Sequence, residues 1–411
     1  MVINTVFDQW WATRKFQRDS TTANRRQIYY QLVEGIVCNF LYAHALNAEG
    51  VSVSRGRREL QAASHYKPSA YTADRFLPLL DELEEMQLLT QDIGDKWKRD
   101  YRKVFGVNVK YVTQHLKRTV LKETRSLIDL YVRFGQAPVA KGEVGFQREQ
   151  QDVILQRKDE FSSLVEYEET PAAEKLRRQM RVVNEMLAKA GPLVAPEYAD
   201  TIDDRQRFLQ RRFTYSSFES GGRLWNGFWQ PMPKVDRPHM IRIQGEKTVE
   251  LDYSNMIMRL AYWLAEEVAP AGDLYRIPGL SQASRPGIKK IMGALFFDTK
   301  PRAKFPKEVK ELFAPEDQAK GFAGVKALID LQHQGIVHLF GTGVGHALQF
   351  RESQLLVNLL IRVKHNGEVA LPIHDAILVR ASAATSMKVL MEWTALRMLG
   401  RVVPVEMKWA A

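Results

Sequence analysis

Two aspartates each lie at the end of a short apolar stretch that is typical of a β-strand. Asp252 is in residues 249–254 and Asp375 is in residues 371–378. Either aspartate alone would usually be a helix cap or a turn residue. Two carboxylates from separate strands, brought together, can hold a pair of divalent cations that clamps the attacking and leaving oxygens of a phosphoryl transfer. The two stretches therefore indicate metal-dependent phosphoryl-transfer chemistry.

The strand that carries Asp252 is predicted from alternation. Side chains in residues 247–252 alternate as they do in a strand with one buried face. Ser254 follows and is well placed to cap a helix over residues 255–267. We therefore expect Asp252 at a strand-to-helix junction, where a carboxylate can point into a cleft.

The second aspartate is expected in a tight hairpin. Residues 369–373 and 376–379 are apolar and lie on either side of His374 and Asp375. Two such runs separated by a short polar pair predict the arms of a hairpin, with the pair at or beside its tip.

A cationic helix is predicted between the two aspartates, over residues 285–297. On a helix, Arg285, Lys289 and Gly293 share one face, and Phe297 lies a turn further on. Such a face can bind a triphosphate and stack on a base. An exposed basic helix start with core phenylalanines is the alternative, and it is disfavoured by the matched carboxylates on either side.

Composition limits the classes of protein. The length of 411 residues favours two or three domains. The formal net charge of +11 favours a polyanionic partner. Cys38 is the single cysteine, which excludes a disulfide framework and a cysteine-based zinc site and favours a reducing compartment. The N-terminus lacks the pattern of a secretion signal, and no apolar stretch has membrane-spanning length. We expect a soluble, cytoplasmic protein with no membrane partner.

The N-terminal part is predicted to be mostly helical. Apolar spacing predicts one helix over residues 24–46 and another over residues 72–86, followed by a short strand from Leu88. A basic segment precedes the second helix, and this order resembles a winged helix-turn-helix. Pro78 lies inside the second predicted helix and counts against that helix, because an interior proline breaks or kinks a helix. A plain helical hairpin with a solvated basic face is equally favoured.

Residues 96–125 are densely basic and carry most of the positive excess of the chain. Aromatic residues are interleaved with the charges, which suits a phosphate track with stacking on single-stranded bases. We expect the aromatic side chains to be core and the charges to contact nucleic acid. The candidate contacts are Lys98, Arg99, Arg102 and Lys103.

Residues 147–189 are rich in Glu, Gln, Arg and Lys and predict two charged helices, broken near residues 169–171. From Phe213 onward, aromatic and β-branched residues become frequent, so this second half is predicted to be a compact mixed α/β domain. Later in it, Glu352 falls on one face of a predicted helix that can line a template.

Over about residues 221–379 the chain resembles the DNA polymerase I (family A) group and its relatives, the single-subunit phage RNA polymerases. Residues 252–254 followed by Arg259 are similar to the first palm motif of that family, and residues 374–375 to its second. Residues 285–297 are similar to its nucleotide-binding fingers helix, and residues 222–224 and 230–233 to its approach to the first palm motif.

This resemblance implies a right-hand polymerase core of palm, fingers and thumb, which is an α+β fold, behind a helical, winged-helix-like N-terminal domain. It implies a two-metal mechanism with Mg²⁺, for which Mn²⁺ can substitute. The implied metal-binding groups are Asp252, Asp375 and the backbone of Tyr253. The implied nucleotide-binding residues are Arg285, Lys289, Lys290, Gly293, Phe297 and Ile257. The implied primer- and template-binding residues are Arg223, Gln230, His374 and Arg259.

The chain departs from the family pattern at three places. Ile257 stands where the DNA polymerases have a glutamate that excludes the ribose 2′-hydroxyl, and Gly293 stands where they have an aromatic residue that senses the sugar. Ala376 stands where they have a further carboxylate. The pair Lys289 and Lys290 is closer to the RNA polymerases.

We therefore expect a DNA-directed DNA polymerase that acts on a primer-template duplex and nucleoside triphosphates. The expected division is residues 1–135 as the nucleic-acid-binding region, 136–215 as a thumb of charged helices, and 216–411 as palm and compact fingers. One alternative is an RNA- or primer-synthesising polymerase of the same fold. The other is a non-catalytic DNA-binding replication or regulatory protein with a decayed palm.

Overall fold

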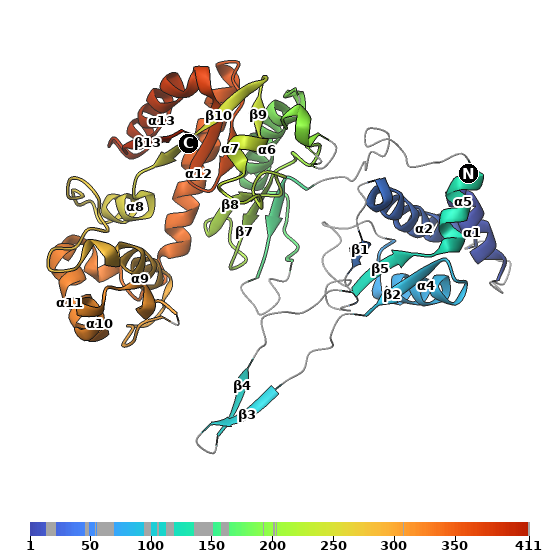
Figure 1. Ribbon diagram of the computed structural model, residues 1–411, viewed down its shortest axis with the longest axis horizontal. Coiled ribbons are helices and arrows are strands. Elements are labelled where there is room, and N and C mark those ends of the chain that lie inside the picture. Colours follow the sequence, from blue (N-terminus) through green and yellow to red (C-terminus); the bar gives the residue numbers. More distant parts are fainter. Residues whose placement is uncertain are drawn as a thin grey trace. The chain divides into compact units, whose positions relative to one another are not determined.

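The computed structural model describes residues 1–13, 22–45, 49–53, 55, 70–93, 100–104, 107–111, 119–134, 151–157, 164–191, 193–199, 202, 204–306 and 308–409. At residues 22, 23, 45, 100–104 and 107–111 it describes the backbone alone. The chain forms two compact units, Met1–Gln150 and Gln151–Ala411 (Figure 1). No helix among these residues is both long enough and apolar enough to cross a membrane.

The first unit combines helices with a small antiparallel sheet. Its described helices are α1 (Val2–Ala12), α2 (Thr22–Ala45), α4 (Ala73–Glu85) and α5 (Arg125–Arg133). Its sheet has the order β1-β5-β2, with β1 (Val51–Val53), β5 (Thr119–Glu123) and β2 (Leu89–Asp92). Strands β3 (Asp100–Val104) and β4 (Val107–Tyr111) pair as a hairpin.

The two helices predicted in this unit are confirmed as α2 and α4. The apolar positions of α4 are spaced three and four apart, so they bury one face, which includes Phe76, Leu79 and Leu83. Thr72 is the N-cap residue of α4. Pro78 lies inside the helix with its ring exposed, so it removes one backbone hydrogen bond without disturbing the buried face.

Most of the basic tract, residues 96–125, lies between strands β2 and β5, and its last part includes β5. These strands pair antiparallel, and the β3–β4 hairpin comes from the segment that joins them. Lys98 and Arg99 fall outside the described residues, and Arg102 and Lys103 belong to β3, of which only the backbone is described. The strand predicted from Leu88 is confirmed as β2.

The second unit is a mixed α/β structure with two sheets. The larger sheet has the order β11-β12-β10-β13, with β9 (Arg242–Ile243) on the first half of β10. Its strands are β10 (Glu246–Tyr253), β11 (Leu371–Ile373), β12 (Ala376–Arg380) and β13 (Val405–Lys408). The smaller sheet has the order β6-β7-β8, with β6 (Val153–Leu155), β7 (Gln210–Phe213) and β8 (Gly221–Trp225).

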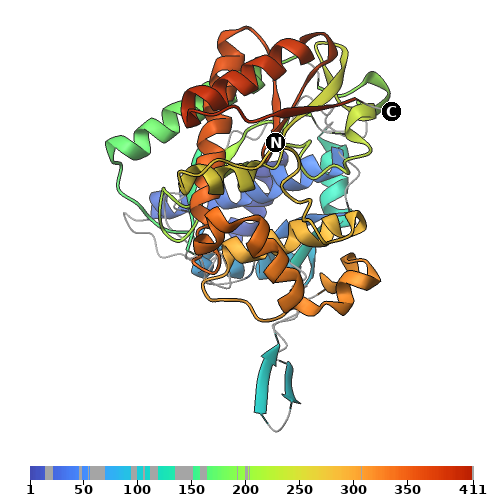
Figure 2. The ribbon, with the colours of Figure 1, turned by 90° about the vertical axis from the view of Figure 1, so that its left-hand side faces the viewer.

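The described helices of this unit are α6 (Pro171–Lys189), α7 (Arg237–Met240), α8 (Met256–Leu264), α9 (Arg285–Phe297), α10 (Pro315–Ala319), α11 (Gly321–Gln332), α12 (Gly345–His365) and α13 (Ala384–Leu399). Helix α12 runs through the middle of the unit, and it contacts α6, α8, α9, α13 and β8. In both ribbon views α9, α10 and α11 gather at one end of α12, and the larger sheet with α13 lies at the other (Figures 1 and 2). One continuous core therefore positions both ends of the unit.

Removal of core volume from α12 should destabilise the whole second unit. Leu360 on α12 is 0% exposed, so Leu360→Ala is expected to lower the free energy of unfolding by about 2–5 kcal/mol. Val389→Ala on α13 is the control, because Val389 is 60% exposed, and its cost should stay under about 0.5 kcal/mol. Urea denaturation followed by tryptophan fluorescence measures both. Equal losses in the two variants would contradict this account of the core.

Two local predictions are wrong. The first charged helix predicted within residues 147–170 is replaced, over the described part 151–157, by strand β6, because its apolar triplet pairs in parallel with β7. Ser254 does not cap the next helix; Asn255 is the N-cap of α8 in a left-handed conformation, with φ of +55°. The Ser254 hydroxyl instead donates to Glu406 on β13 at 2.9 Å.

Candidate active site

Strand β10 and the β11–β12 hairpin bring the two aspartates together. Asp252 lies opposite Ala376 in the antiparallel ladder, and Asp375 immediately precedes Ala376. The backbone N–H of Tyr253 donates to the backbone carbonyl of Asp375 at 3.4 Å. His374 takes the left-handed conformation, with φ of +58°, that the tight turn requires. The predicted strand and hairpin are confirmed, and the turn presents Asp375 beside Asp252.

Asp375 lies among other negative charges. Burial, followed by the charges of Glu352 and Asp252, raises the pKa of the Asp375 carboxyl to about 7. The same carboxylate raises the pKa of Tyr275, for which burial is the larger cause. Part of the Asp375 surface stays open to solvent. The charges of Asp252 and Asp375 thus repel each other, and a bound cation would relieve this repulsion.

Arg223 on β8 and Glu352 on α12 form a bidentate ion pair next to this pair of aspartates. Nε and Nη2 of Arg223 donate to Oε1 and Oε2 of Glu352 at 2.8 and 3.1 Å. Glu352 is 3% exposed, so its charge depends on this partner, and two parallel bonds fix the guanidinium plane. Arg223 keeps part of its side chain exposed, which leaves it able to meet a ligand.

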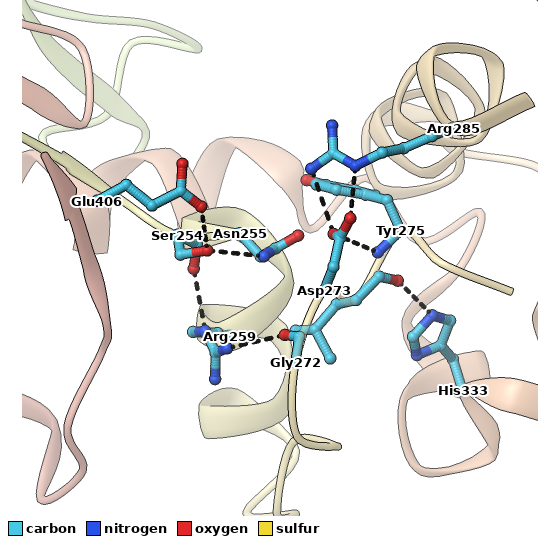
Figure 3. Close-up of polar contacts among 10 residues, drawn as sticks. Ser254, Asn255, Arg259, Gly272, Asp273, Tyr275, Arg285, His333 and Glu406 are labelled. Atoms are coloured by element: carbon cyan, nitrogen blue, oxygen red, sulfur yellow. Dashed lines mark hydrogen bonds and ion pairs between the residues drawn. The ribbon is translucent and has the colours of Figure 1, made fainter. Parts of the chain in front are cut away.

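Helix α9 carries the predicted cationic face. Arg285 and Lys289 are exposed and both lie over the ring of Tyr275, at 5.6 and 5.9 Å from its centroid. Asp273 accepts two bonds from Arg285, at 2.5 and 3.2 Å, which hold the guanidinium above that ring (Figure 3). Besides burial, the charge of Asp375 raises the pKa of the Tyr275 hydroxyl and the charge of Arg285 lowers it. The cations of α9 therefore lie over one ring, that of Tyr275, whose pKa the Asp375 charge also raises.

Three further residues of α9 are among the predicted nucleotide-binding residues: Lys290, Gly293 and Phe297. Lys290 is exposed, and an added Cβ at Gly293 would meet open space. Phe297 packs edge-on against His346, with ring centroids 4.8 Å apart. The structure thus places a small residue and a partly exposed ring one and two turns beyond the cations of this helix.

Gln230 and Arg259 use their polar atoms within the protein. Nε2 of Gln230 donates to the carbonyls of Leu224 and Pro372 at 2.9 and 3.3 Å, so this side chain ties β8 to the hairpin strand. Nε of Arg259 donates to the carbonyl of Ser254 at 2.9 Å, and Nη2 donates to Gly272 at 3.3 Å (Figure 3).

Two further predicted residues have different surroundings. Ile257 on α8 is partly buried against the core of the second unit. His374 is exposed beside Trp225, and the two ring centroids are 5.5 Å apart. His374 is thus the more accessible of the two to a bound strand.

Strand β13 adds charged residues that the sequence did not indicate. It pairs antiparallel with β10, so that Glu406 lies opposite Asp252 and Lys408 lies opposite Glu250. The ammonium of Lys408 donates to Oδ2 of Asp252. No sequence motif surrounds these residues, and their relevance follows only from the strand pairing.

The donors that the described residues offer a metal are mainly carboxylate oxygens. Across the described part of the chain there is no cluster of three or more His, Cys, Asp or Glu side chains arranged to hold a metal. The available set is Asp252 with Asp375, and carboxylate oxygens are the ligands that Mg²⁺ and Mn²⁺ prefer. Since Mg²⁺ usually keeps several waters and takes only one or two protein carboxylates, this set fits such an ion.

Among the comparisons with known proteins, only the comparison with solved structures finds matches. No protein-family model and no curated protein matches the chain. Among solved structures, the chain is similar to the POL domain of Pol1 from M. smegmatis in complex with DNA primer-template and dNTP, at 12% sequence identity and a TM-score of 0.34. The match covers 93% of this chain and 64% of that chain, so this chain spans a little under two thirds of that length. Function is therefore argued from the site.

Proposed function

We propose that this chain is a template-directed nucleotidyltransferase, a DNA-directed DNA polymerase of the family A type. The observation that supports the proposal is the placement of Asp375 next to Asp252 by the β10–β12 ladder, together with the cations of Arg285 and Lys289 over Tyr275, a residue whose pKa the Asp375 charge raises in addition to burial. Paired carboxylates next to a cationic helix face are what a nucleoside triphosphate and its metal ions require.

The proposed reaction is attack of a primer 3′-hydroxyl on the α-phosphate of a nucleoside triphosphate, which forms a phosphodiester bond, breaks the bond between the α- and β-phosphates and releases pyrophosphate and the hydroxyl proton. Asp252 and Asp375, with the backbone of Tyr253 beside them, would hold two Mg²⁺ ions. When bound, such ions supply charge stabilisation at the attacking and leaving oxygens. The protein's own contribution is to keep one carboxylate on β10 and the other in the turn just before the adjacent strand β12, where the strand pairing fixes their positions.

The cations of α9 are assigned to the triphosphate. Arg285, Lys289 and Lys290 would neutralise its charge, and Phe297 would pack against the incoming base. Asp273 keeps the Arg285 guanidinium oriented before a nucleotide arrives. Because the fixed donors need not reorganise during the reaction, they stabilise the developing charge efficiently.

Arg223, His374, Gln230 and Arg259 are assigned to the primer and template side. Arg223 would contact the minor groove of the duplex from its bidentate pair with Glu352, and His374 would contact the primer end or support Asp375. Gln230 and Arg259 would act through the elements that they tie together.

Selection of the sugar is assigned to Ile257 and Gly293. The bulk of Ile257 would exclude a 2′-hydroxyl in place of a glutamate, whereas the open space at Gly293 favours ribonucleotides. Because Gly293 favours ribonucleotides while Ile257 would exclude them, an RNA- or primer-synthesising enzyme is the second candidate function. In either case residues 216–411 would form palm and fingers, and residues 136–215 the thumb.

The first unit is proposed to be a winged-helix-like nucleic-acid-binding region. Helix α4 precedes β2, the β3–β4 hairpin follows, and β5 lies between β1 and β2, and this order supports the proposal of a helix followed by a wing. The exposed face of α4 includes Asp81 and Glu85, and an acidic face repels phosphate. We therefore assign the contacts to the basic wing and its flanks, not to α4.

The wing assignment predicts a change in the salt dependence of binding. Replacement of Lys98, Arg99, Arg102 and Lys103 by alanine should flatten the plot of log affinity against log salt by about one unit per lost phosphate contact. Fluorescence anisotropy with a labelled duplex at several salt concentrations measures this slope. The matched control replaces Lys175 and Lys310, exposed lysines of the second unit. An unchanged slope in the fourfold variant would mean that the tract is only a solvated face.

Extension of a labelled primer-template with Mg²⁺ and either dNTPs or rNTPs tests the function. The proposal predicts template-directed incorporation of dNTPs. Incorporation of rNTPs alone would support the RNA-synthesising alternative. Retained duplex binding without incorporation would support a non-catalytic binding protein.

A further inference from the structure

Strand β13 places a lysine on the proposed metal-binding aspartate. In the β10–β13 ladder, Glu250 faces Lys408 and Asp252 faces Glu406. Alternate residues of a strand point to the same face of a sheet, and residues directly opposite in an antiparallel pair share that face. These four side chains therefore form one charged row beside the hairpin that carries Asp375.

Lys408 lies at the centre of this row. Its ammonium is hydrogen-bonded to Oδ2 of Asp252, and it lies 3.6 Å from Oε1 of Glu250 and 4.0 Å from Oε2 of Glu406. One ammonium therefore lies among three carboxylates and offsets part of their negative charge. Its shortest contact is to Asp252, the residue that the proposed function needs as a ligand.

The other two carboxylates have further partners. Glu250 is also 3.2 Å from Lys234, and Oε1 of Glu406 accepts from the hydroxyl of Ser254 at 2.9 Å (Figure 3). Of the two Glu406 oxygens, Oε1 is bonded to Ser254, while Oε2 is the one that lies 4.0 Å from the Lys408 ammonium. A displaced ammonium can move to this oxygen by a side-chain rotation, without movement of the strand.

We propose that Lys408 holds the cation position at Asp252 in the metal-free protein and gives way, toward Glu406, when a divalent cation binds. The proposal rests on the proposed role of Asp252 as a metal ligand. The ammonium occupies a lone-pair position of Oδ2 that a metal ion could use, and its positive charge repels a divalent ion near Asp252. Lys408 is therefore an internal competitor that weakens metal binding and keeps the carboxylates ordered without metal.

Mn²⁺ binding tests this directly, without any need for catalysis. Titration calorimetry of purified wild-type protein is compared with Lys408→Gln, and Asp252→Asn identifies the part of the signal that belongs to this site. Lys408→Gln should bind Mn²⁺ about fivefold more tightly or better, since the lost pair is partly exposed. Lys234→Gln is the matched control, because Lys234 contacts Glu250 in the same row, and its affinity should stay within about twofold of wild type.

A second measurement uses the wild-type protein, in case Lys408→Gln does not fold. Acylation of Lys408 by a small anhydride, followed by peptide mass spectrometry, should be faster with Mn²⁺ than without, because a nitrogen released from Asp252 is a better nucleophile. Acylation of Lys234 should change little. The same Lys408 rate with and without Mn²⁺ would overturn the proposal.

The outcomes separate this proposal from the proposed function. Tighter Mn²⁺ binding by Lys408→Gln in a protein that extends no primer would support the lysine's role and remove the polymerase assignment. Primer extension together with unchanged Mn²⁺ affinity in Lys408→Gln would overturn the lysine's role alone. Absence of any Asp252-dependent Mn²⁺ binding in both proteins would also overturn it.

Discussion

Replacement of Asp252 or Asp375 by alanine is expected to lower the rate of nucleotide incorporation by at least roughly 10²–10³-fold. Each variant removes one of two carboxylates that the β10–β12 ladder holds side by side, and a single remaining carboxylate cannot hold both ions of a two-metal site. Single-turnover kinetics with a saturating primer-template measures the chemical step.

The Asp375 variant should fold at least as stably as the wild-type protein. Burial, followed by the charges of Glu352 and Asp252, raises the pKa of Asp375, so removal of its carboxyl relieves both the burial of a charge and the repulsion. Glu316→Ala, an exposed acidic residue of α10, is the control and should leave incorporation unchanged. Wild-type rates in both aspartate variants would refute the assignment of the metal site.

Replacement of Arg285 or Lys289 by alanine is expected to reduce kcat/KM for the nucleotide by roughly 10- to 100-fold each, the loss that one charge-assisted hydrogen bond gives. Both cations lie over Tyr275, and neither contributes to the core. The loss should therefore appear without a change in thermal stability. The Arg285 variant also leaves Asp273 without its bidentate partner, which adds a negative charge near the triphosphate.

Affinity for the primer-template separates the nucleotide role from a general electrostatic effect. It should stay within about twofold of wild type in both variants, because the assigned contacts of α9 are to the nucleotide. Lys310→Ala, an exposed lysine of the same unit, should change neither quantity. A uniform loss of duplex affinity in all three variants would mean that α9 only contributes to a diffuse positive field.

The elements that depend on local pattern could be predicted from the sequence. Strand β10, the β11–β12 hairpin and helix α9 each follow from the spacing of apolar side chains, which sets the buried face whatever the partner. The placement of Asp252 and Asp375 beside each other follows from the antiparallel pairing of two strands whose existence was already clear.

The elements that depend on distant partners could not be predicted. Serine is a residue type that often caps helices, but the hydroxyl of Ser254 donates to Glu406 on β13 instead. The apolar triplet of β6 is short enough to belong to a helix or a strand, and parallel pairing with β7 decides it. Lys408 reaches Asp252 only through the register of β13 against β10, for which the sequence carries no signal.

Single-nucleotide extension with four templates that differ in the templating base is the most direct test of metal-dependent, template-directed transfer at this site. The purified chain should add the complementary nucleotide on each template in Mg²⁺, and it should add none after chelation of the metal or in the Asp252→Ala and Asp375→Ala variants. Incorporation that survives both alanine substitutions, or that ignores the templating base, would contradict the central claim.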